Sequence, residues 1–218
     1  MLKIGHRGAK SHVLENTLES FLKAFELGAD GVELDVHLSA DGEVVVIHDE
    51  TVDRTIKNAT GFIKEFTVAE CQKLGIPTLV EVFHILPKES FLNIEIKDPN
   101  ATIIVIEKFL QLQEIECKDI LVSSFHWDVL SQIAKNNPKI QLGVLTEVED
   151  LAKAFNFAKQ INAFSINPCF KYLTKDFIQI AHQYGFKIHT WTVNTPEDIT
   201  FVKSLGVDAI ISDFPDRL

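Results

Sequence analysis

Short apolar runs alternate with amphipathic stretches along the whole chain. The runs are rich in Val, Ile and Leu, which is typical of buried strands, whereas apolar positions three and four residues apart indicate helices that bury one face. Leu18, Phe21, Leu22 and Phe25 show this helical spacing. The predicted strands are residues 2–5, 31–38, 91–96, 120–124, 140–145, 163–166, 187–193 and 209–211.

Helices are predicted between these strands. Asn16 is the expected N-cap of the first helix, because Glu19 three residues later completes a capping-box pattern, and Gly28 marks the end of that helix. Pro196 lies in the first turn of the last one, where a proline is well tolerated. The predicted helices are residues 17–27, 101–111, 127–135, 148–158, 175–184 and 196–205.

The eight alternating strand units, joined by short connections, predict a parallel sheet. A closed (β/α)8 TIM barrel is the economical α/β arrangement for eight such units, and an open doubly wound sheet is the structural alternative. We expect one barrel domain over residues 1–218. Residues 43–47 are predicted to form a hairpin strand after the second strand, and residues 49–79, with the turn residues Asn58 and Gly61, an insertion.

Polar side chains recur where the predicted strands end. The active site of a (β/α)8 barrel lies at the carboxyl ends of its strands, so these side chains are expected to converge on one mouth. They are His6, Arg7, Glu33, Asp35, His48, Glu95, Lys97, Ser124, Asn167, Trp191, Ser212 and Asp213.

Three carboxylates in this set form a candidate metal site. Glu33 and Asp35 are two residues apart in a predicted strand, so they point to the same face, and Glu95 lies on the next barrel strand. Oxygen-only ligands favour one hard divalent cation, Mg²⁺ or Ca²⁺, and Mn²⁺ is also compatible. The alternative is a purely structural salt bridge from Lys97 or Arg7.

His6 and His48 flank these carboxylates on consecutive strand ends. An imidazole titrates near neutral pH, so the two are candidates for general acid and base. Arg7 and Lys97 supply fixed positive charge for a phosphoryl group. Trp191 is a candidate substrate-binding wall of the pocket, or else a core aromatic. The other histidines are interpreted as surface or scaffold, although His37 shares a strand face with the carboxylates.

The composition of the chain disfavours several classes of binding partner and of covalent or metal site. The net charge of −10 disfavours binding to nucleic acid or to an anionic membrane surface. If the substrate is a phosphate, local cations must reverse the sign of the charge at the site, and a bound divalent metal is the most direct way. Cys71, Cys117 and Cys169 are far apart and in no metal-binding spacing, so neither a disulfide framework nor a thiolate site is expected. No signal-peptide pattern and no apolar run of about 18 residues is visible, so we expect a cytoplasmic protein without stable membrane association.

Several motifs, in order along the chain, resemble the glycerophosphodiester phosphodiesterases, a family within the phosphatidylinositol-phospholipase-C-like barrels. No single motif is specific to this family, but the whole set in this order is. The matching pieces are His6-Arg7-Gly8-Ala9, Glu15-Asn16-Thr17, Gly31-Val32-Glu33-Leu34-Asp35-Val36, Val45-Val46-Ile47-His48-Asp49, Asp53-Arg54-Thr55, Ile76-Pro77-Thr78-Leu79 with Glu81, Ile94-Glu95-Ile96-Lys97, Thr190-Trp191-Thr192-Val193-Asn194, and 206–215 from Gly206 to Pro215.

The resemblance implies metal-dependent hydrolysis of a small glycerophosphodiester to sn-glycerol 3-phosphate and an alcohol, a step in glycerol and lipid metabolism. It implies that Glu33, Asp35 and Glu95 hold one divalent ion, and that the histidines His6 and His48 act as acid and base. It also implies that Arg7 and Lys97 bind the phosphate. The chemistry implied has two steps, in which a glycerol hydroxyl expels the alcohol and water then opens a cyclic phosphate.

The sequence departs from the family pattern at two places. Leu14 replaces the usual proline before Glu15, and the segment between Leu74 and Ile76 is shortened to Gly75. A shorter cap implies a more open pocket, so the resemblance does not extend to the preferred alcohol. A lysophospholipase-D-like phosphodiesterase and a non-catalytic binding barrel are the competing hypotheses. A dead barrel would lack a histidine or a carboxylate, and none is missing.

Overall fold

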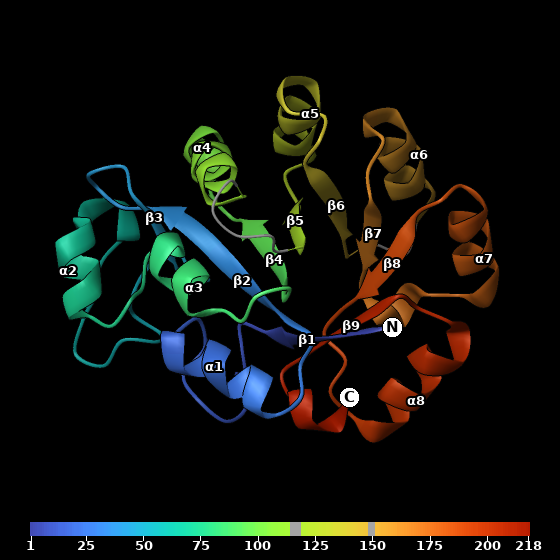
Figure 1. The fold of residues 1–218 in the computed structure, drawn as a ribbon, viewed down its shortest axis with the longest axis horizontal. Coiled ribbons are helices and arrows are strands. Elements are labelled where there is room, and N and C mark those ends of the chain that lie inside the picture. The colour runs from blue at the N-terminus through green and yellow to red at the C-terminus, as the bar shows by residue number, and fades with distance from the viewer. Residues whose placement is uncertain (114–118, 148–150) are drawn as a thin grey trace.

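The computed structural model describes residues 1–113, 119–147 and 151–218 (Figure 1). Within these residues, eight parallel strands form a closed barrel, because the first strand pairs with both the second and the last. The predicted (β/α)8 TIM barrel is confirmed. In barrel order the strands are β1 (Leu2–His6), β2 (Gly31–Leu38), β4 (Phe91–Ile96), β5 (Asp119–Ser124), β6 (Gln141–Thr146), β7 (Ser165–Pro168), β8 (Lys187–Thr190) and β9 (Ala209–Ser212).

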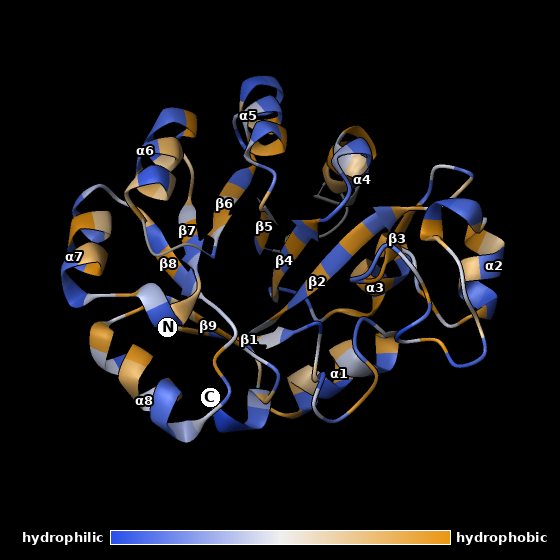
Figure 2. Cartoon of the chain, turned by 180° about the vertical axis from the view of Figure 1, so that it is seen from behind, coloured by the Kyte–Doolittle hydropathy of each residue, from blue (hydrophilic) through white to orange (hydrophobic). Residues whose placement is uncertain are grey.

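The connecting helices lie on the outside of the barrel (Figure 1). Figure 2 shows that they carry hydrophilic and hydrophobic residues together, as expected of helices with one face in water. The α-helices of the barrel are α1 (Leu18–Glu26), α3 (Leu79–Ile85), α4 (Thr102–Gln113), α5 (Trp127–Asn136), α6 (Leu151–Ile161), α7 (Lys175–Gln183) and α8 (Pro196–Leu205). Short 3₁₀ turns are η2 (Pro99–Ala101), η3 (Phe170–Tyr172) and η4 (Pro215–Arg217).

Several predicted boundaries need correction. Strand β7 begins at Ser165 rather than at 163, because the Ala163 amide donates to the Ala158 carbonyl and ends helix α6 instead. Strand β8 ends at Thr190 rather than at 193. Beyond it, Trp191 forms an isolated parallel bridge with Cys169, the residue that follows β7. The predicted start of α6 at 148 lies outside the described residues.

The first helix is capped by Thr17 and not by the expected Asn16. The Thr17 hydroxyl accepts from the Ser20 amide at 3.2 Å, which is the N-cap contact. Asn16 has a φ of 57°, and its side-chain amide instead donates to Asp35 Oδ2 at 2.9 Å. The tertiary contact with the barrel mouth thus takes Asn16 away from the helix end.

The insertion after the second strand packs as a small unit of its own. Strand β3 (Val44–Val46) pairs antiparallel with β2, as predicted, and η1 (Ile63–Glu65) and α2 (Val68–Lys73) follow. Val45, Val52, Ile63 and Cys71 belong to its buried apolar cluster. The insertion is held against the barrel through this cluster and the β2–β3 hairpin.

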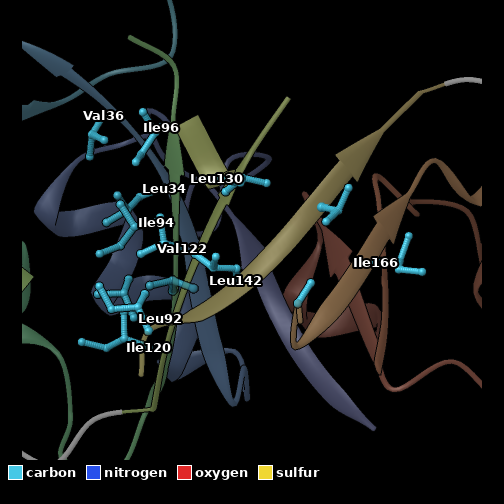
Figure 3. Close-up of a cluster of buried hydrophobic side chains, with 14 of the residues drawn as sticks. Leu34, Val36, Leu92, Ile94, Ile96, Ile120, Val122, Leu130, Leu142 and Ile166 are labelled. Carbon is cyan, nitrogen blue, oxygen red and sulfur yellow. The ribbon is translucent and has the colours of Figure 1, made fainter. Parts of the chain in front are cut away.

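The main core lies between the strands and the helices. Leu34, Leu92 and Ile94 are buried in it, and Figure 3 shows them side by side on neighbouring strands. Alternate residues of a strand face opposite sides of the sheet, so Leu34, Leu92 and Ile94 face the helices, and Asp35 and Glu95 face the barrel interior. Lower in the interior, Ile4, Phe91, Leu121, Ala209 and Ile211 form a separate buried apolar cluster. In the described part of the chain, no helix combines the length and apolar character needed to cross a bilayer.

Candidate active site

Three carboxylates meet inside the barrel mouth. Glu33 and Asp35 come from β2 and Glu95 from β4, where Asp35 and Glu95 are register partners. An oxygen of each lies within 4.8 Å of an oxygen of the other two. Their exposed fractions are 3%, 1% and 9%, respectively. The structure therefore brings the predicted cluster together in a site that water barely reaches.

The cations near this cluster do not fully compensate it. Lys97 Nζ lies 2.9 Å from Glu95 Oε1 and 3.9 Å from Asp35, and Arg7 Nε lies 3.2 Å from Asp35. These are the salt bridges that the sequence offered as an alternative. Glu33 Oε1, however, is buried without a hydrogen-bond partner among the described residues. A structural salt bridge alone thus leaves one buried carboxylate oxygen unsatisfied.

The excess of negative charge also raises the pKa values of two of these carboxyls. Burial, followed by repulsion from Asp35, raises the pKa of Glu95 to about 7. Burial and the charges of Asp35 and Glu95 raise the pKa of Glu33 well above its ordinary value. A bound cation would remove this penalty, and three oxygen donors suit a hard divalent ion. The residues present therefore fit a metal site.

His6 is held by a carboxylate from the other end of the chain. Its Nδ1 lies 2.6 Å from Oδ1 of Asp213, and Asn194 Nδ2 donates to Oδ2 of the same carboxylate at 2.8 Å. Because an ionised carboxylate can only accept, Nδ1 carries the hydrogen and Nε2 is left free. His6 Nε2 lies 4.0 Å from Glu33. Burial lowers the pKa of His6, which favours a neutral imidazole.

His48 is held in the same manner. Its Nδ1 bonds to Asp49, and Arg54 Nε donates to the other Asp49 oxygen at 2.6 Å. His48 Nε2 lies 3.3 Å from Lys97 Nζ. His37, which shares a strand face with the carboxylates as predicted, places its Nε2 3.0 Å from the His48 carbonyl oxygen and so fixes the backbone. Burial lowers the pKa of His48.

Arg7 sits in a tight turn at the end of β1. Its φ is 52° and that of Gly8 is 83°. A Cβ on Gly8 would collide with Ser20 Oγ and with the Ser20 carbonyl, so only glycine fits there. Arg7 Nη1 donates to Glu15 at 2.7 Å, and Arg54 donates to the same Glu15 oxygen at 2.6 Å. Glu15 therefore joins the two arginines at the rim of the mouth.

One cavity of about 230 Å³ opens at this mouth. Of the predicted site residues, only Asp35 lies behind its wall. Phe125, Leu145, Glu147 and Ile211 form much of the opposite side. The predicted site residues that line the cavity are His6, Arg7, Glu33, His48, Glu95, Lys97 and Trp191.

Trp191 is fixed at the cavity wall by a hydrogen bond and an aromatic contact. Its Nε1 donates to the Asn167 carbonyl at 2.7 Å, and Phe125 meets it edge to face with ring centroids 5.5 Å apart. Trp191 lines the cavity and also packs against the apolar cluster of the barrel interior, so its position combines the two interpretations open from the sequence, pocket wall and core aromatic. Phe125 is 40% exposed and stands between the cavity and solvent.

The sequence assigned no specific chemical role to several residues of the site. Asp213, Asp49, Glu15 and Arg54 all belong to the quoted motifs, which was the available signal, but their partners depend on loop geometry. Phe125 directly follows the fourth of the eight predicted barrel strands and gave no chemical signal. Ser124, at the end of β5, donates to the Ile96 carbonyl at 2.8 Å and is a scaffold residue.

Comparison with known proteins gives a consistent result. The model of the Glycerophosphoryl diester phosphodiesterase family matches residues 6–217. A glycerophosphodiester phosphodiesterase of Caldanaerobacter subterraneus is 38% identical over 234 residues, which cover 100% of this chain and 96% of that protein.

Solved structures agree with the sequence relatives. A glycerophosphodiester phosphodiesterase from Thermotoga maritima has a TM-score of 0.86 at 32% identity, covering 99% of this chain and 96% of that one. A phosphodiesterase from Oleispira antarctica, solved in complex with the product sn-glycerol-3-phosphate, has a TM-score of 0.87 at 25% identity. That comparison covers 98% of this chain and 93% of the Oleispira chain.

Proposed function

Because the chain belongs to the glycerophosphoryl diester phosphodiesterase family, we propose that it hydrolyses small glycerophosphodiesters to sn-glycerol 3-phosphate and an alcohol. Full-length relatives that are 38% and 36% identical are glycerophosphodiester phosphodiesterases, and this chain is an enzyme of that class. The proposal adds one divalent cation and proton transfer by two histidines. It rests chiefly on one observation: His6, His48 and the partly uncompensated carboxylate Glu33 line the same cavity.

The cation would be held by Glu33, Asp35 and Glu95, with neither cysteine nor histidine among its protein ligands. Oxygen donors favour Mg²⁺ or Ca²⁺, and Mn²⁺ is compatible. When bound, such an ion neutralises negative charge that develops on the phosphoryl oxygens. The acidic net charge of the chain makes a local positive centre more necessary for an anionic substrate.

The imidazoles would move protons in both steps. In the first, one imidazole takes the proton of a glycerol hydroxyl as its oxygen forms a bond to phosphorus, and the other gives a proton to the departing alcohol oxygen. In the second, water adds to phosphorus and the ring P–O bond of the cyclic phosphate breaks, with the two roles exchanged. Asp213 and Asp49 hold His6 and His48 in the tautomer that leaves Nε2 for this work.

Arg7 and Lys97 would orient the phosphate. Both line the cavity beside the imidazoles, and each is anchored by a carboxylate, Glu15 for Arg7 and Glu95 for Lys97. An anchored cation loses little conformational freedom when it binds an anion. Trp191 would form the wall against which the glycerol carbons pack, because its indole is already fixed by Asn167.

The size of the cavity favours a small substrate. In a lysophospholipid the acyl chain is attached to the glycerol, so the chain would have to share this space. At about 230 Å³ the cavity is smaller than the roughly 300–1,000 Å³ of typical ligand pockets. This supports a water-soluble diester over the lysophospholipase-D-like alternative, although one human relative at 25% identity is a lysophospholipase D.

A substrate panel tests the proposal. Glycerophosphodiesters are incubated with the protein in excess Mg²⁺ or Ca²⁺, or in excess chelator, and glycerol 3-phosphate is followed by a coupled assay. We expect product with metal and none in chelator. A deoxy analogue without the hydroxyl next to the phosphoester should be a poor substrate, since that hydroxyl is the nucleophile. Full activity in chelator would refute the metal, and equal turnover of the deoxy analogue would refute the two steps.

A further inference from the structure

A single arginine of the insertion connects two carboxylates at the rim of the barrel mouth. Arg54 uses all three of its guanidinium nitrogens, and each of them donates a hydrogen bond to Asp49, to Glu15 or to both. Nε and Nη2 donate to Asp49 at 2.6 and 3.1 Å, whereas Nη1 and Nη2 donate to Glu15 at 3.1 and 2.6 Å. Two bidentate contacts from one planar group fix the two carboxylates relative to each other.

Each of these carboxylates holds a side chain of the proposed reaction. Asp49 bonds to Nδ1 of His48, and Glu15 accepts from Nη1 of Arg7 at 2.7 Å. The five side chains thus form a continuous series of hydrogen bonds, from an imidazole that would transfer protons to a guanidinium that would orient the phosphate. Arg54 is the middle residue of this series, although it belongs to neither the described cavity wall nor the carboxylate cluster.

The insertion fixes the backbone that carries Arg54. The amides of Thr55 and Ile56 donate to the Val52 carbonyl at 3.3 and 2.9 Å, which forms a tight turn. Val52 is fully buried in the apolar cluster of the insertion. The turn therefore presents the Arg54 side chain at a set position, so little conformational freedom is lost when its hydrogen bonds form.

These contacts join the insertion to the barrel beside the imidazoles. Glu15 lies in the loop between β1 and α1, and its contact with Arg54 spans 39 positions of the sequence. Asp49 and Arg54 belong to the insertion itself. Resting on the proposed function, we propose that Arg54 is a positioning residue that holds His48 and Arg7 in their reactive orientations, so that the insertion completes the active site.

Arg54 also keeps both carboxylates ionised. Its hydrogen bonds are the main reason that the pKa of Asp49 lies well below the ordinary value. Burial on its own would raise the pKa of Glu15, but the hydrogen bonds from Arg54 and the charge of Arg7 lower it to about 2. An ionised Asp49 can only accept, so it keeps the hydrogen of His48 on Nδ1 and leaves Nε2 free. The Asp49 side chain is 26% exposed, so without Arg54 it could turn toward water.

A structural ion pair is the competing interpretation of the same contacts. The Arg54 side chain is 47% exposed, and exposed ion pairs contribute little to stability because water screens them. A purely structural role therefore predicts a small change in Tm and no change in the tautomer or the kinetics. A positioning role predicts that both of these change while the fold stays intact.

The tautomer of His48 gives a readout that does not depend on turnover. Nitrogen-15 NMR of the full-length protein at about pH 8, where this imidazole is neutral, reports which ring nitrogen carries hydrogen. His48→Gln identifies the signal. The wild type should carry hydrogen on Nδ1, whereas Arg54→Ala should show a mixture of the two tautomers.

Steady-state kinetics measure the effect on both His48 and Arg7, with the glycerophosphodiester that the wild type hydrolyses fastest. Arg54→Ala should lower kcat about ten- to hundredfold through His48, less than loss of the imidazole itself. It should also raise KM about three- to tenfold through Arg7. Arg54→Lys keeps the charge but replaces three donor nitrogens by one, so its kcat should stay within about threefold of the Arg54→Ala value.

A double-mutant cycle tests whether Arg54 links the two carboxylates. The effects of Glu15→Gln and Asp49→Asn on kcat/KM should depart from additivity by more than about threefold when Arg54 is present, and by less than about twofold in Arg54→Ala. The control is Lys57→Ala, which removes an exposed cation three residues away. Its kcat and KM should stay within about twofold of wild type.

The possible outcomes separate the positioning role from the proposed function. An unchanged His48 tautomer, full turnover in Arg54→Lys, or additive effects in the presence of Arg54 would overturn the positioning role. A fall in Tm alone, with tautomer and kinetics intact, would leave Arg54 a structural ion pair and overturn it as well. A wild type that releases no glycerol 3-phosphate from any diester would overturn the proposed function, whereas a changed tautomer in Arg54→Ala would still support the positioning of His48.

Discussion

Asp213 Oδ1 lies 2.6 Å from His6 Nδ1 and so joins the loop after the last barrel strand to the end of the first. The two residues are 207 positions apart in the sequence. Their contact exists only because the barrel closes between β1 and β9. It sets which ring nitrogen of His6 faces the cavity, so the closure of the fold decides the protonation pattern of the site.

Replacing Asp213 should therefore lower kcat far more than it lowers metal affinity. Asp213→Asn can donate to His6 Nδ1 and so favours the wrong tautomer. We expect kcat to fall by about 10²–10⁴, with metal affinity within about threefold of wild type. Steady-state kinetics and metal titration check this, and Asp216→Asn, nearby and 42% exposed, is the control. Unchanged kcat in Asp213→Asn would show that the contact does not set the tautomer.

The two imidazoles should act together, so the losses caused by replacing them should not add. His6→Ala and His48→Ala should each lower turnover by about 10²–10⁴, and the double variant should be little worse than either single. Metal content should persist in all three, and the pH–rate profile of the wild type should be bell-shaped, with its limbs belonging to the pair. His12→Ala, at an exposed position, is the control. A single variant that retains more than about a tenth of turnover would remove that histidine from the pair.

The carboxylate cluster should lower the stability of the metal-free protein. Glu33→Gln removes a buried negative charge while its amide oxygen can still accept from the Arg7 backbone amide, now 3.0 Å from Oε2. We expect metal-free stability at neutral pH to hold or rise, by about 1 kcal/mol, or roughly 2–4 °C in Tm for a chain of this size.

Added metal should stabilise the wild type but not the Glu33→Gln variant. Mg²⁺ or Ca²⁺ should raise the Tm of the wild type and leave that of Glu33→Gln nearly unchanged, because ligand binding stabilises only a protein with an intact site. Glu95→Ala should lose metal affinity in the same way. Thermal unfolding with and without metal measures both, and Glu26→Gln, 66% exposed on α1, is the control. A large fall in the metal-free Tm would favour a purely structural salt bridge.

The pH dependence of stability should contain a contribution from His189. This side chain is only 2% exposed and packs against the ring of Phe91. Its Nδ1 has no hydrogen-bond partner among the described residues, and burial lowers the pKa of the imidazole to about 4. Between the unfolded value of 6.5 and about 4 the folded protein binds fewer protons than the unfolded one. Stability must therefore fall as pH drops through this window, and it is fully present above it.

The size of that contribution can be isolated by substitution. From pH 7 to pH 5 the wild type should lose about 2 kcal/mol more stability than His189→Leu. Urea unfolding at several pH values measures the difference, with His84→Leu, exposed on α3, as the control. Parallel curves for wild type and His189→Leu would contradict the expectation.

The sequence alone was enough for the plan of the barrel. Hydrophobic spacing gave the bounds of β2, β4 and α8 without error. Seven of the predicted site residues line the cavity at the mouth, because parallel strands all end on the same side of a barrel. Helix α3 was missed, although Thr78 and Glu81 form its capping box, because a helix of only 7 residues shows too little periodicity.

Only the tertiary structure decided which side chains act together. Nothing local links His6 to Asp213, Arg54 to Glu15, or Lys97 to His48. Periodicity reports whether a side chain faces the core, which each strand decides for itself within a few residues. Pairing across the mouth depends on loop paths and on closure of the barrel, since these bring residues from distant segments within hydrogen-bond distance.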